Sequence, residues 1–147
     1  MNTIVILIAA GIVCCIGIVD AKYLIFSPNG GISNWNDAVN YCKRRSANIV
    51  KIENRGEWNN LYNLLQCENK SGDGWFIGGR ARNGRWYWED GSSMRFKNFA
   101  SDLRLFPQTG TIRTVYNYAY VPTYGRKWKY VSRRSSNKLG VICEKRC

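Results

Sequence analysis

The densest side-chain chemistry in this chain is cationic. Residues 126–134 read RKWKYVSRR, which places five cations in nine residues with no acid among them. Residues 100–147 contain ten Lys and Arg but only two acids, Asp102 and Glu144. Arginine suits sulfate and phosphate because its planar guanidinium donates two parallel hydrogen bonds, whereas lysine acts as a point charge. We therefore expect a surface that binds negatively charged ligands.

Two groups of cations are the candidate polyanion-binding residues. The first group comprises Arg104, Arg113, Arg126, Lys127, Lys129, Arg133 and Arg134, and the second, on a turn between two expected strands, comprises Arg80, Arg82 and Arg85. Side chains of a strand alternate between its faces, so Lys127, Lys129 and Val131 share one face while Trp128 and Tyr130 share the other. The lysines, rather than Trp128, are expected to face the ligand.

Catalysis finds little support in the residue types. The chain contains no histidine, so the usual general base and the commonest zinc ligand are missing. Ser, Asp and Glu are present, but no imidazole can activate a nucleophile. The cysteines after residue 21 are expected to form disulfides, so they are not available as zinc ligands and no ordinary zinc site remains. We expect a protein that is not an enzyme and that has no cofactor.

The N-terminal segment indicates the compartment. Residues 1–21 form an apolar run that ends in small residues before Lys22, a pattern typical of a secretory signal peptide cleaved after Ala21. Residues 22–147 then form one domain of ordinary size. An uncleaved anchor is the alternative, because the run is nearly long enough to span a bilayer. We expect a secreted, extracellular protein with no stable membrane span after cleavage.

The high positive net charge indicates which classes of molecule the protein could bind. The chain carries a net charge of +12, and loss of Asp20 with the leader raises it to +13. Such a surface attracts polyanions, which outside the cell are sulfated glycans, microbial polymers, acidic lipids or mineral surfaces. Nucleic acid is not expected as a partner, because secretion separates the protein from it. A basic surface that only maintains solubility is the alternative reading.

The cysteines outside the leader number four: Cys42, Cys67, Cys143 and Cys147. In a secreted domain they are expected to form disulfides, but four cysteines allow three pairings and spacing alone does not choose among them. Asn69-Lys70-Ser71 is a glycosylation sequon in a turn-rich stretch, so Asn69 is a candidate glycosylation site.

Local patterns predict an α+β fold. A strand is expected at residues 22–26. A first helix is indicated by apolar residues at helical spacing (Trp35, Ala38, Val39 and Cys42), capped by Ser33 or Asn34. Residues 54–57 have the spacing of a capping box before a second helix that ends near Cys67. From residue 74 onward, short aromatic and β-branched runs separated by turns predict a sheet.

Four motifs in this order resemble the landmarks of the C-type lectin-like domain family. They are Trp35-x-x-Ala38-x-x-x-Cys42, Trp75-Phe76-Ile77-Gly78-Gly79, Trp86-Tyr87-Trp88-Glu89-Asp90-Gly91-Ser92 and Gly140-Val141-Ile142-Cys143-Glu144. The short length and Tyr23-Leu24-Ile25-Phe26-Ser27 are similar to the secreted single-domain lectins of insects. The resemblance implies two helices packed on antiparallel sheets, with a long irregular loop.

The resemblance also implies roles for cysteines and tryptophans. Cys42 and Cys143 would form the family's disulfide that joins the ends of the domain. Cys67 and Cys147 are then left over, and they pair with each other or Cys147 links to a partner chain in a dimer. In the family a tryptophan at the place of Trp128 is a core residue, and the same role is expected of the chain's other tryptophans: Trp35, Trp58, Trp75, Trp86 and Trp88.

This sequence lacks the residues that bind calcium in the sugar-binding members of the family. Those members use a Glu-Pro-Asn or Gln-Pro-Asp triplet in the long loop and an Asn-Asp pair after a tryptophan, because calcium takes six to eight oxygen ligands. Here the tryptophan is followed by Lys129 and Tyr130, and residues 106–108 are Phe-Pro-Gln. We therefore expect no calcium-dependent sugar binding at that place.

An auxiliary calcium site is a weaker candidate. Glu53, Glu57 and Glu144 fall where some relatives hold a second calcium. The competing interpretation is structural: Glu57 caps its helix, and Glu144 pairs with a cation such as Lys51 or Lys145. We favour the structural interpretation, because Lys51 stands where those relatives supply another oxygen.

These observations predict a secreted, calcium-independent C-type lectin-like protein that recognises anionic glycans or other extracellular polyanions, including microbial surface polymers, through a basic long-loop face. The alternative is a protein-interaction effector module of innate immunity, venom or saliva, suggested by apolar long-loop residues: Leu103, Leu105 and Phe106. A cationic membrane-active or mineral-binding protein is a third reading.

Overall fold

The computed structural model describes residues 4–8, 12–16, 22–68, 70–100, 116–132 and 137–145. It contains two helices, α1 (Trp35–Lys43) and α2 (Arg55–Leu65). The strands are β1 (Ile4–Ile8), β2 (Ile12–Ile16), β3 (Tyr23–Phe26), β4 (Asn48–Ile49), β5 (Gly74–Arg82), β6 (Arg85–Trp88), β7 (Tyr116–Pro122), β8 (Lys129–Ser132) and β9 (Leu139–Glu144).

Each helix is preceded by an asparagine that caps its N-terminus. The Asn34 side chain accepts a hydrogen bond from the backbone N–H of Asp37, and Asn54 does the same for Glu57. A helix leaves its first N–H groups without intrahelical partners, so these caps stabilise the two starts. The Glu57 carboxylate accepts from the N–H of Glu53 rather than from the cap residue, which ties the chain before α2 to its first turn.

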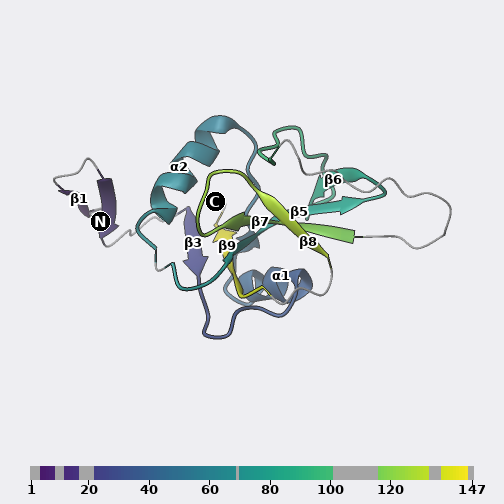
Figure 1. Cartoon of the computed structure of the whole chain (residues 1–147), viewed down its shortest axis with the longest axis horizontal. Helices are drawn as coiled ribbons and strands as arrows, with labels where there is room; N and C mark the ends of the chain where they lie inside the picture. The colour runs from purple at the N-terminus through teal and green to yellow at the C-terminus, as the bar shows by residue number, and fades with distance from the viewer. Residues whose placement is uncertain are drawn as a thin grey trace.

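Seven strands form one mixed sheet in the order β3-β9-β5-β7-β8, with β4 added beside β9 and β6 beside β5 (Figure 1). All pairs are antiparallel except β5 and β9, since Leu139 starts β9 beside Gly74, the first residue of β5. The expectation of antiparallel sheets is therefore wrong for this pair, because hydrophobic patterns do not encode strand direction.

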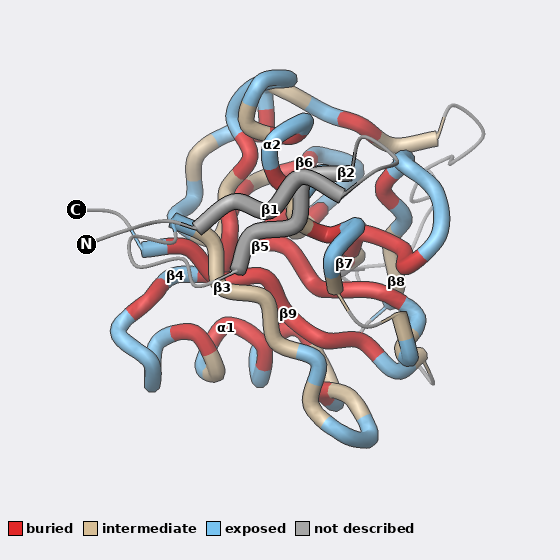
Figure 2. The backbone as a smooth tube through the Cα atoms, turned by 90° about the vertical axis from the view of Figure 1, so that its left-hand side faces the viewer, coloured by how far each residue is buried: buried red, intermediate tan, exposed pale blue. Residues whose placement is uncertain are grey.

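The helices cover the sheet on either side, and each closes a separate core (Figure 1). On the α2 side the core includes Trp58, Trp75, Trp86, Trp88 and Trp128, and on the α1 side it includes Trp35 and Tyr118. All six tryptophans are at most 7% exposed, which confirms their expected core role. Figure 2 shows β5 and β9 buried along most of their length, with β3 half-buried.

A disulfide between Cys42 of α1 and Cys143 of β9 confirms the pairing that the resemblance implied. Cys67 is exposed just after α2, whereas Cys147 lies outside the described residues, so their pairing and the link to a partner chain stay predictions. The β1–β2 hairpin falls within the segment predicted to be a signal peptide, and cleavage also stays a prediction. No helix in the described part of the chain is long and apolar enough to cross a bilayer.

Candidate functional site

Trp128 marks the place where the sequence departs from the calcium-binding pattern. Its side chain is 0% exposed and meets the rings of Trp58, Phe96 and Phe99 edge to face at 5.6 to 5.7 Å. Lys127 and Lys129 on either side are exposed, and Tyr130 is half-buried against Trp86. The alternation expected from the sequence is confirmed, and it turns both lysines toward solvent.

Arg126, Lys127 and Lys129, which we call the 126–129 cations, are exposed, and the first two contact neutral groups. The Arg126 guanidinium lies 4.4 Å from the centre of the Tyr62 ring and donates to Asn59 Oδ1 at 3.2 Å, so it rests on α2. Lys127 Nζ donates to Asn98 Oδ1 at 3.3 Å. Since amides and rings carry no net charge, these contacts with described residues do not cancel the positive charge of Arg126 and Lys127.

The remaining members of the first group cannot be placed beside these residues. Arg104, Arg113, Arg133 and Arg134 lie outside the described residues, as do Asn69 and the long-loop residues Leu103, Leu105 and Phe106. Their contributions to a common basic face stay predictions.

The second group forms a groove, which we call the arginine groove. It is open, has a volume of about 600 Å³, and is lined by Arg80, Arg82, Asn83, Arg85, Tyr87 and Gly91. In the β5–β6 pair, Arg80 lies opposite Tyr87 and Arg82 lies opposite Arg85, while Ala81 opposite Trp86 faces the core. The structure thus brings the three candidate arginines together on one face of one hairpin.

A second charged region, the acidic corner, consists of Lys22, Lys51, Glu53, Glu57, Asp90 and Glu144. Lys51 Nζ lies 3.0 Å from Glu53 and 3.1 Å from Asp90, and Lys22 Nζ lies 3.4 Å from Glu57. The three glutamates considered for an auxiliary calcium are therefore accompanied by two ammonium groups. Within the described residues, no three His, Cys, Asp or Glu side chains are grouped as a metal site.

Glu144 is 1% exposed and accepts a hydrogen bond from the main chain. Its Oε1 accepts the backbone N–H of Lys51 at 3.0 Å, whereas the Lys51 ammonium pairs with Glu53 and Asp90. A buried carboxylate needs hydrogen bonds, and the backbone N–H of Lys51, two residues after β4, supplies one. The described hydrogen bond of Glu144 is thus to the main chain of Lys51, and its expected ion pair with a cation such as Lys51 or Lys145 stays a prediction.

The ionisation of the acidic corner follows from its contacts. The Ser92 hydroxyl and backbone N–H both donate to Asp90 Oδ1, at 2.6 and 2.9 Å, and with the Lys51 ammonium they lower the pKa of Asp90 to about 2. The Glu53 carboxylate, followed by Asp90, raises the pKa of Lys51. Both ammonium groups of this region are therefore paired with carboxylates within the fold.

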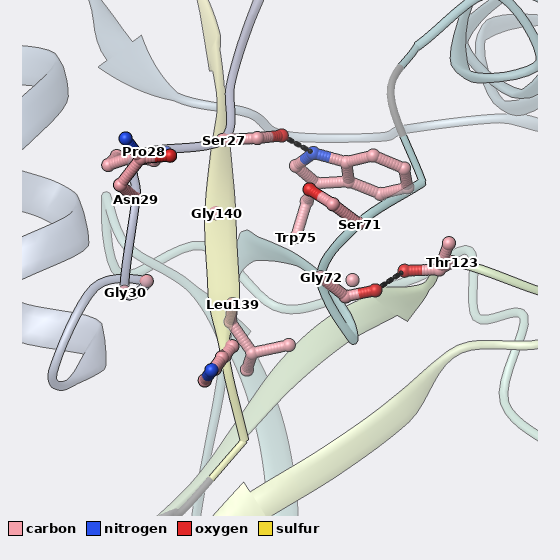
Figure 3. A pocket seen from close by; sticks show the side chains of 13 residues that line it. Ser27, Pro28, Asn29, Gly30, Ser71, Gly72, Trp75, Thr123, Leu139 and Gly140 are labelled. Carbon is pink, nitrogen blue, oxygen red and sulfur yellow. Dashed lines mark hydrogen bonds between the residues drawn. The ribbon is translucent and has the colours of Figure 1, made fainter.

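A small polar cavity lies between β3, β5 and β9 (Figure 3). Its volume of about 150 Å³ is below the range typical of small-molecule sites. Trp75 Nε1 donates to Ser27 Oγ at 2.9 Å, and the Thr123 hydroxyl donates to the Gly72 carbonyl. A Cβ at Gly140 would lie 2.1 Å from the Phe26 carbonyl oxygen, so close strand packing explains this glycine.

Sequence reasoning missed the neutral members of the arginine groove: Asn83, Tyr87 and Gly91. A signal was present, because Asn-Gly between two β-prone runs predicts a two-residue hairpin turn. Such a turn fixes Arg82 opposite Arg85 and Arg80 opposite Tyr87, as observed.

Comparison with known proteins gives consistent relatives. The sequence model of the family described as "Lectin C-type domain" matches residues 32–145. Galactose-specific lectin nattectin of Thalassophryne nattereri is 30% identical over 76 residues, which are 50% of this chain and 48% of that protein. The matches span about half, or less, of the length of the curated relatives, 48% and 34%.

Solved structures show the same fold. The structure described as the SPL-1–GlcNAc complex superposes with a TM-score of 0.65 at 19% identity, covering 85% of this chain and 87% of that one. The calcium-independent C-type lectin SPL-2 from Saxidomus purpuratus superposes with a TM-score of 0.61 at 20% identity, covering 85% and 86%. At these identities the likeness concerns the fold.

Proposed function

Because the chain belongs to the C-type lectin domain family, we propose that it is a secreted, calcium-independent carbohydrate-binding protein that recognises anionic glycans through basic surfaces. The observation that carries this proposal is the state of the 126–129 cations. Lys129 begins β8, where the family resemblance places oxygen ligands of calcium-binding members, and Arg126 and Lys127 precede it. The described contacts of Arg126 and Lys127 are amides and a ring rather than acids.

Calcium independence follows from the side chains that replace the ligands. An ammonium at Lys129 repels a divalent cation, and a half-buried phenol at Tyr130 is a poor ligand for a hard ion. The fold itself is compatible with this behaviour, since SPL-2 is described as a calcium-independent lectin. Without a bridging metal, recognition must rest on direct contacts from side chains to the glycan.

The ligand class follows from charge. Sulfate and phosphate groups on glycans would contact the 126–129 cations and the arginines of the groove, and long-range attraction increases the encounter rate. The surface formed by the 126–129 cations is proposed to be extended by Arg104, Arg113, Arg133 and Arg134. The leader-like residues 1–21 support secretion, where sulfated glycans and microbial surface polymers are the available polyanions.

Heparin chromatography in EDTA tests the proposal. We expect the protein to elute well above about 0.15 M salt, because several cations must be displaced together. The triple variant R126Q/K127Q/K129Q should elute at clearly lower salt than wild type. A charge-matched control, R44Q/K138Q/K145Q, removes three exposed cations elsewhere and should shift elution less. Elution at or below physiological salt, or equal shifts in both triples, contradicts the proposal.

A protein-interaction role is the second candidate, and one residue favours it. Tyr124 is 74% exposed on the β7–β8 turn, with Lys70 Nζ 5.4 Å from its ring centre. Exposed aromatic residues beside cations are common at protein interfaces. Binding to a protein that persists at high salt and is lost in Tyr124→Ala would support this role, and loss of all binding at high salt argues against it.

A further inference from the structure

We propose that the arginine groove is a preformed site for a single sulfate or phosphate monoester carried on a sugar ring. The inference rests on the proposed function only for the sugar, since the groove's affinity for the oxyanion is argued from its own geometry. It differs from diffuse polyanion attraction because it assigns one anionic group to one pair of arginines.

The groove is built from facing positions of two strands. Arg82 lies directly opposite Arg85, and Arg80 lies directly opposite Tyr87, so these four residues occupy one face of the β5–β6 hairpin as two adjacent pairs. All four line the groove. Two guanidinium groups that start from opposite strands can each present two N–H donors to the same tetrahedral oxyanion, a geometry that lysines would not match.

Arg82 and Arg85 carry charges that the described residues do not compensate. No acidic residue is among the residues that line the groove. Within the described part of the chain, neither the Arg82 nor the Arg85 side chain makes a hydrogen bond, ion pair or cation–π contact. Like charges directly opposite in an antiparallel pair repel each other and destabilise it. A bound oxyanion would remove that repulsion, so the pair favours an anion between its two members.

The hairpin is rigid enough to hold this arrangement before a ligand binds. Asn83 and Gly84 both have positive φ, 51° and 77°, as a two-residue hairpin turn requires. On the reverse face Ala81 and Trp86 are buried in the core. Arg80 lies with its guanidinium 5.3 Å from the centre of the Trp35 ring, which fixes the inner end of the groove. Preorganisation reduces the entropy lost on binding.

The neutral side of the groove suits a sugar ring. Tyr87 is half-buried, lines the groove and lies opposite Arg80 in the strand register, so it offers an aromatic ring and a hydroxyl to a ligand. Gly91 has a φ of 88° and no side chain, which leaves space at the wall. The volume of about 600 Å³ lies within the range of small-ligand sites. The expected ligand is therefore a sulfated or phosphorylated sugar.

Titration of the full-length folded protein with three monosaccharides, followed by NMR amide shifts, tests the site. The probes are galactose 6-sulfate, galactose 6-phosphate and galactose. We expect saturable shifts at Arg82–Arg85 and Tyr87 with one or both charged sugars and none with galactose. The two charged probes distinguish a sulfated from a phosphorylated source. Absence of saturable shifts with both charged sugars overturns the proposal.

Variants separate a specific site from total charge. R82Q/R85Q should weaken binding of the charged sugar by at least about tenfold, because it removes two bidentate donors. K138Q/K145Q removes the same charge from two exposed positions that do not line the groove, and it should change this binding less than about twofold. Equal weakening in the two doubles contradicts the proposal. Arg85→Glu, which keeps the hairpin folded by pairing with Arg82, should also abolish binding, and retained binding would count against the site.

Failure of this site and failure of the proposed function give different results. If heparin retention is normal while galactose 6-sulfate and galactose 6-phosphate do not bind, only the monoester site is wrong. If heparin is not retained but a charged monosaccharide shifts Arg82–Arg85, the groove stands and polyanion recognition by the whole surface is wrong.

Discussion

The acidic corner includes Asp90, and the arginine groove is lined by the next residue, Gly91. The two regions differ in whether their charged side chains have partners of opposite charge. In the corner, Lys51 lies 3.0 Å from Glu53 and 3.1 Å from Asp90, and Glu144 accepts a main-chain N–H at 3.0 Å. In the groove, Arg82 and Arg85 face each other with no lining acid. Charges that are satisfied within the fold contribute to stability, whereas charges left without counterions are available for a ligand.

This contrast explains why the net charge alone is a poor guide to the site. The chain carries +12 overall, yet cations of the corner are cancelled locally. Exposed ion pairs stabilise a fold weakly, while the same cations without partners attract anions over about a Debye length. The two regions should therefore respond differently to substitution: the corner in stability and the groove in binding.

Cutting the Cys42–Cys143 disulfide is the strongest way to loosen the corner without changing its charges. The bond closes a loop with a sequence separation of 101 and anchors β9, which carries Glu144. We expect C42A/C143A to lose about 3 to 5 kcal/mol of unfolding free energy, because the unfolded chain gains entropy. Urea unfolding measures the loss, and a change below about 1 kcal/mol would show that the bond does not constrain the domain.

Removing the buried carboxylate should have the next largest effect. Glu144→Ala leaves the Lys51 N–H without its acceptor and opens space at a position that is 1% exposed, so we expect a loss of roughly 1 to 3 kcal/mol. Glu144→Gln retains an oxygen acceptor and should lose less. In the groove, Arg82→Gln should change stability by no more than about 0.5 kcal/mol. Equal losses in E144A and R82Q, measured by urea unfolding, would remove the contrast.

Acid should weaken the corner through Asp90. Its pKa falls from an ordinary 3.8 to about 2 in the fold, chiefly because of the Ser92 hydrogen bonds, so the unfolded chain binds the proton more readily. The stabilisation is complete above about pH 4 and is lost as pH falls to about 2. Because 53% of the side chain is exposed, solvent screening limits it to roughly 0.5 to 1 kcal/mol.

The measurement for Asp90 is urea unfolding between pH 2 and 5, with Asp90→Asn as the matched control. Wild type should lose its advantage over the variant as the pH decreases through this window. A difference between the two proteins that is constant with pH would mean that the Asp90 carboxylate has no special role.

Reversing one charge in the groove should give the smallest stability change. Arg85→Glu replaces a repulsive cross-strand pair with an attractive one opposite Arg82, so we expect a gain of roughly 0.2 to 0.5 kcal/mol, with Arg85→Gln in between. Urea midpoints measure this difference. A loss of stability in R85E would mean that Arg85 already has a favourable partner in the fold.

The sequence predicted most of the fold because its signals are local. Helical spacing and asparagine caps located α1 and α2, and four motifs in order indicated the family and the Cys42–Cys143 bond. The parallel β5–β9 pair was missed, because direction depends on where a distant strand enters the sheet.

The candidate site was predictable in residue type but not in partners. The sequence showed the basic composition of residues 126–129, yet Arg126 rests on Tyr62 and Asn59 of α2, which are more than 60 positions away. Contacts of this kind are set by packing of the whole domain. The arginine groove was within reach, since the Asn83-Gly84 turn alone determines the register that pairs Arg82 with Arg85.

A glycan array screened with and without calcium at two salt concentrations tests the central claim most directly. We predict that sulfated or phosphorylated glycans bind equally in EDTA and in calcium, and that binding weakens at the higher salt because the contacts are ionic. Binding confined to neutral glycans, or binding of any glycan that requires calcium, would contradict the account.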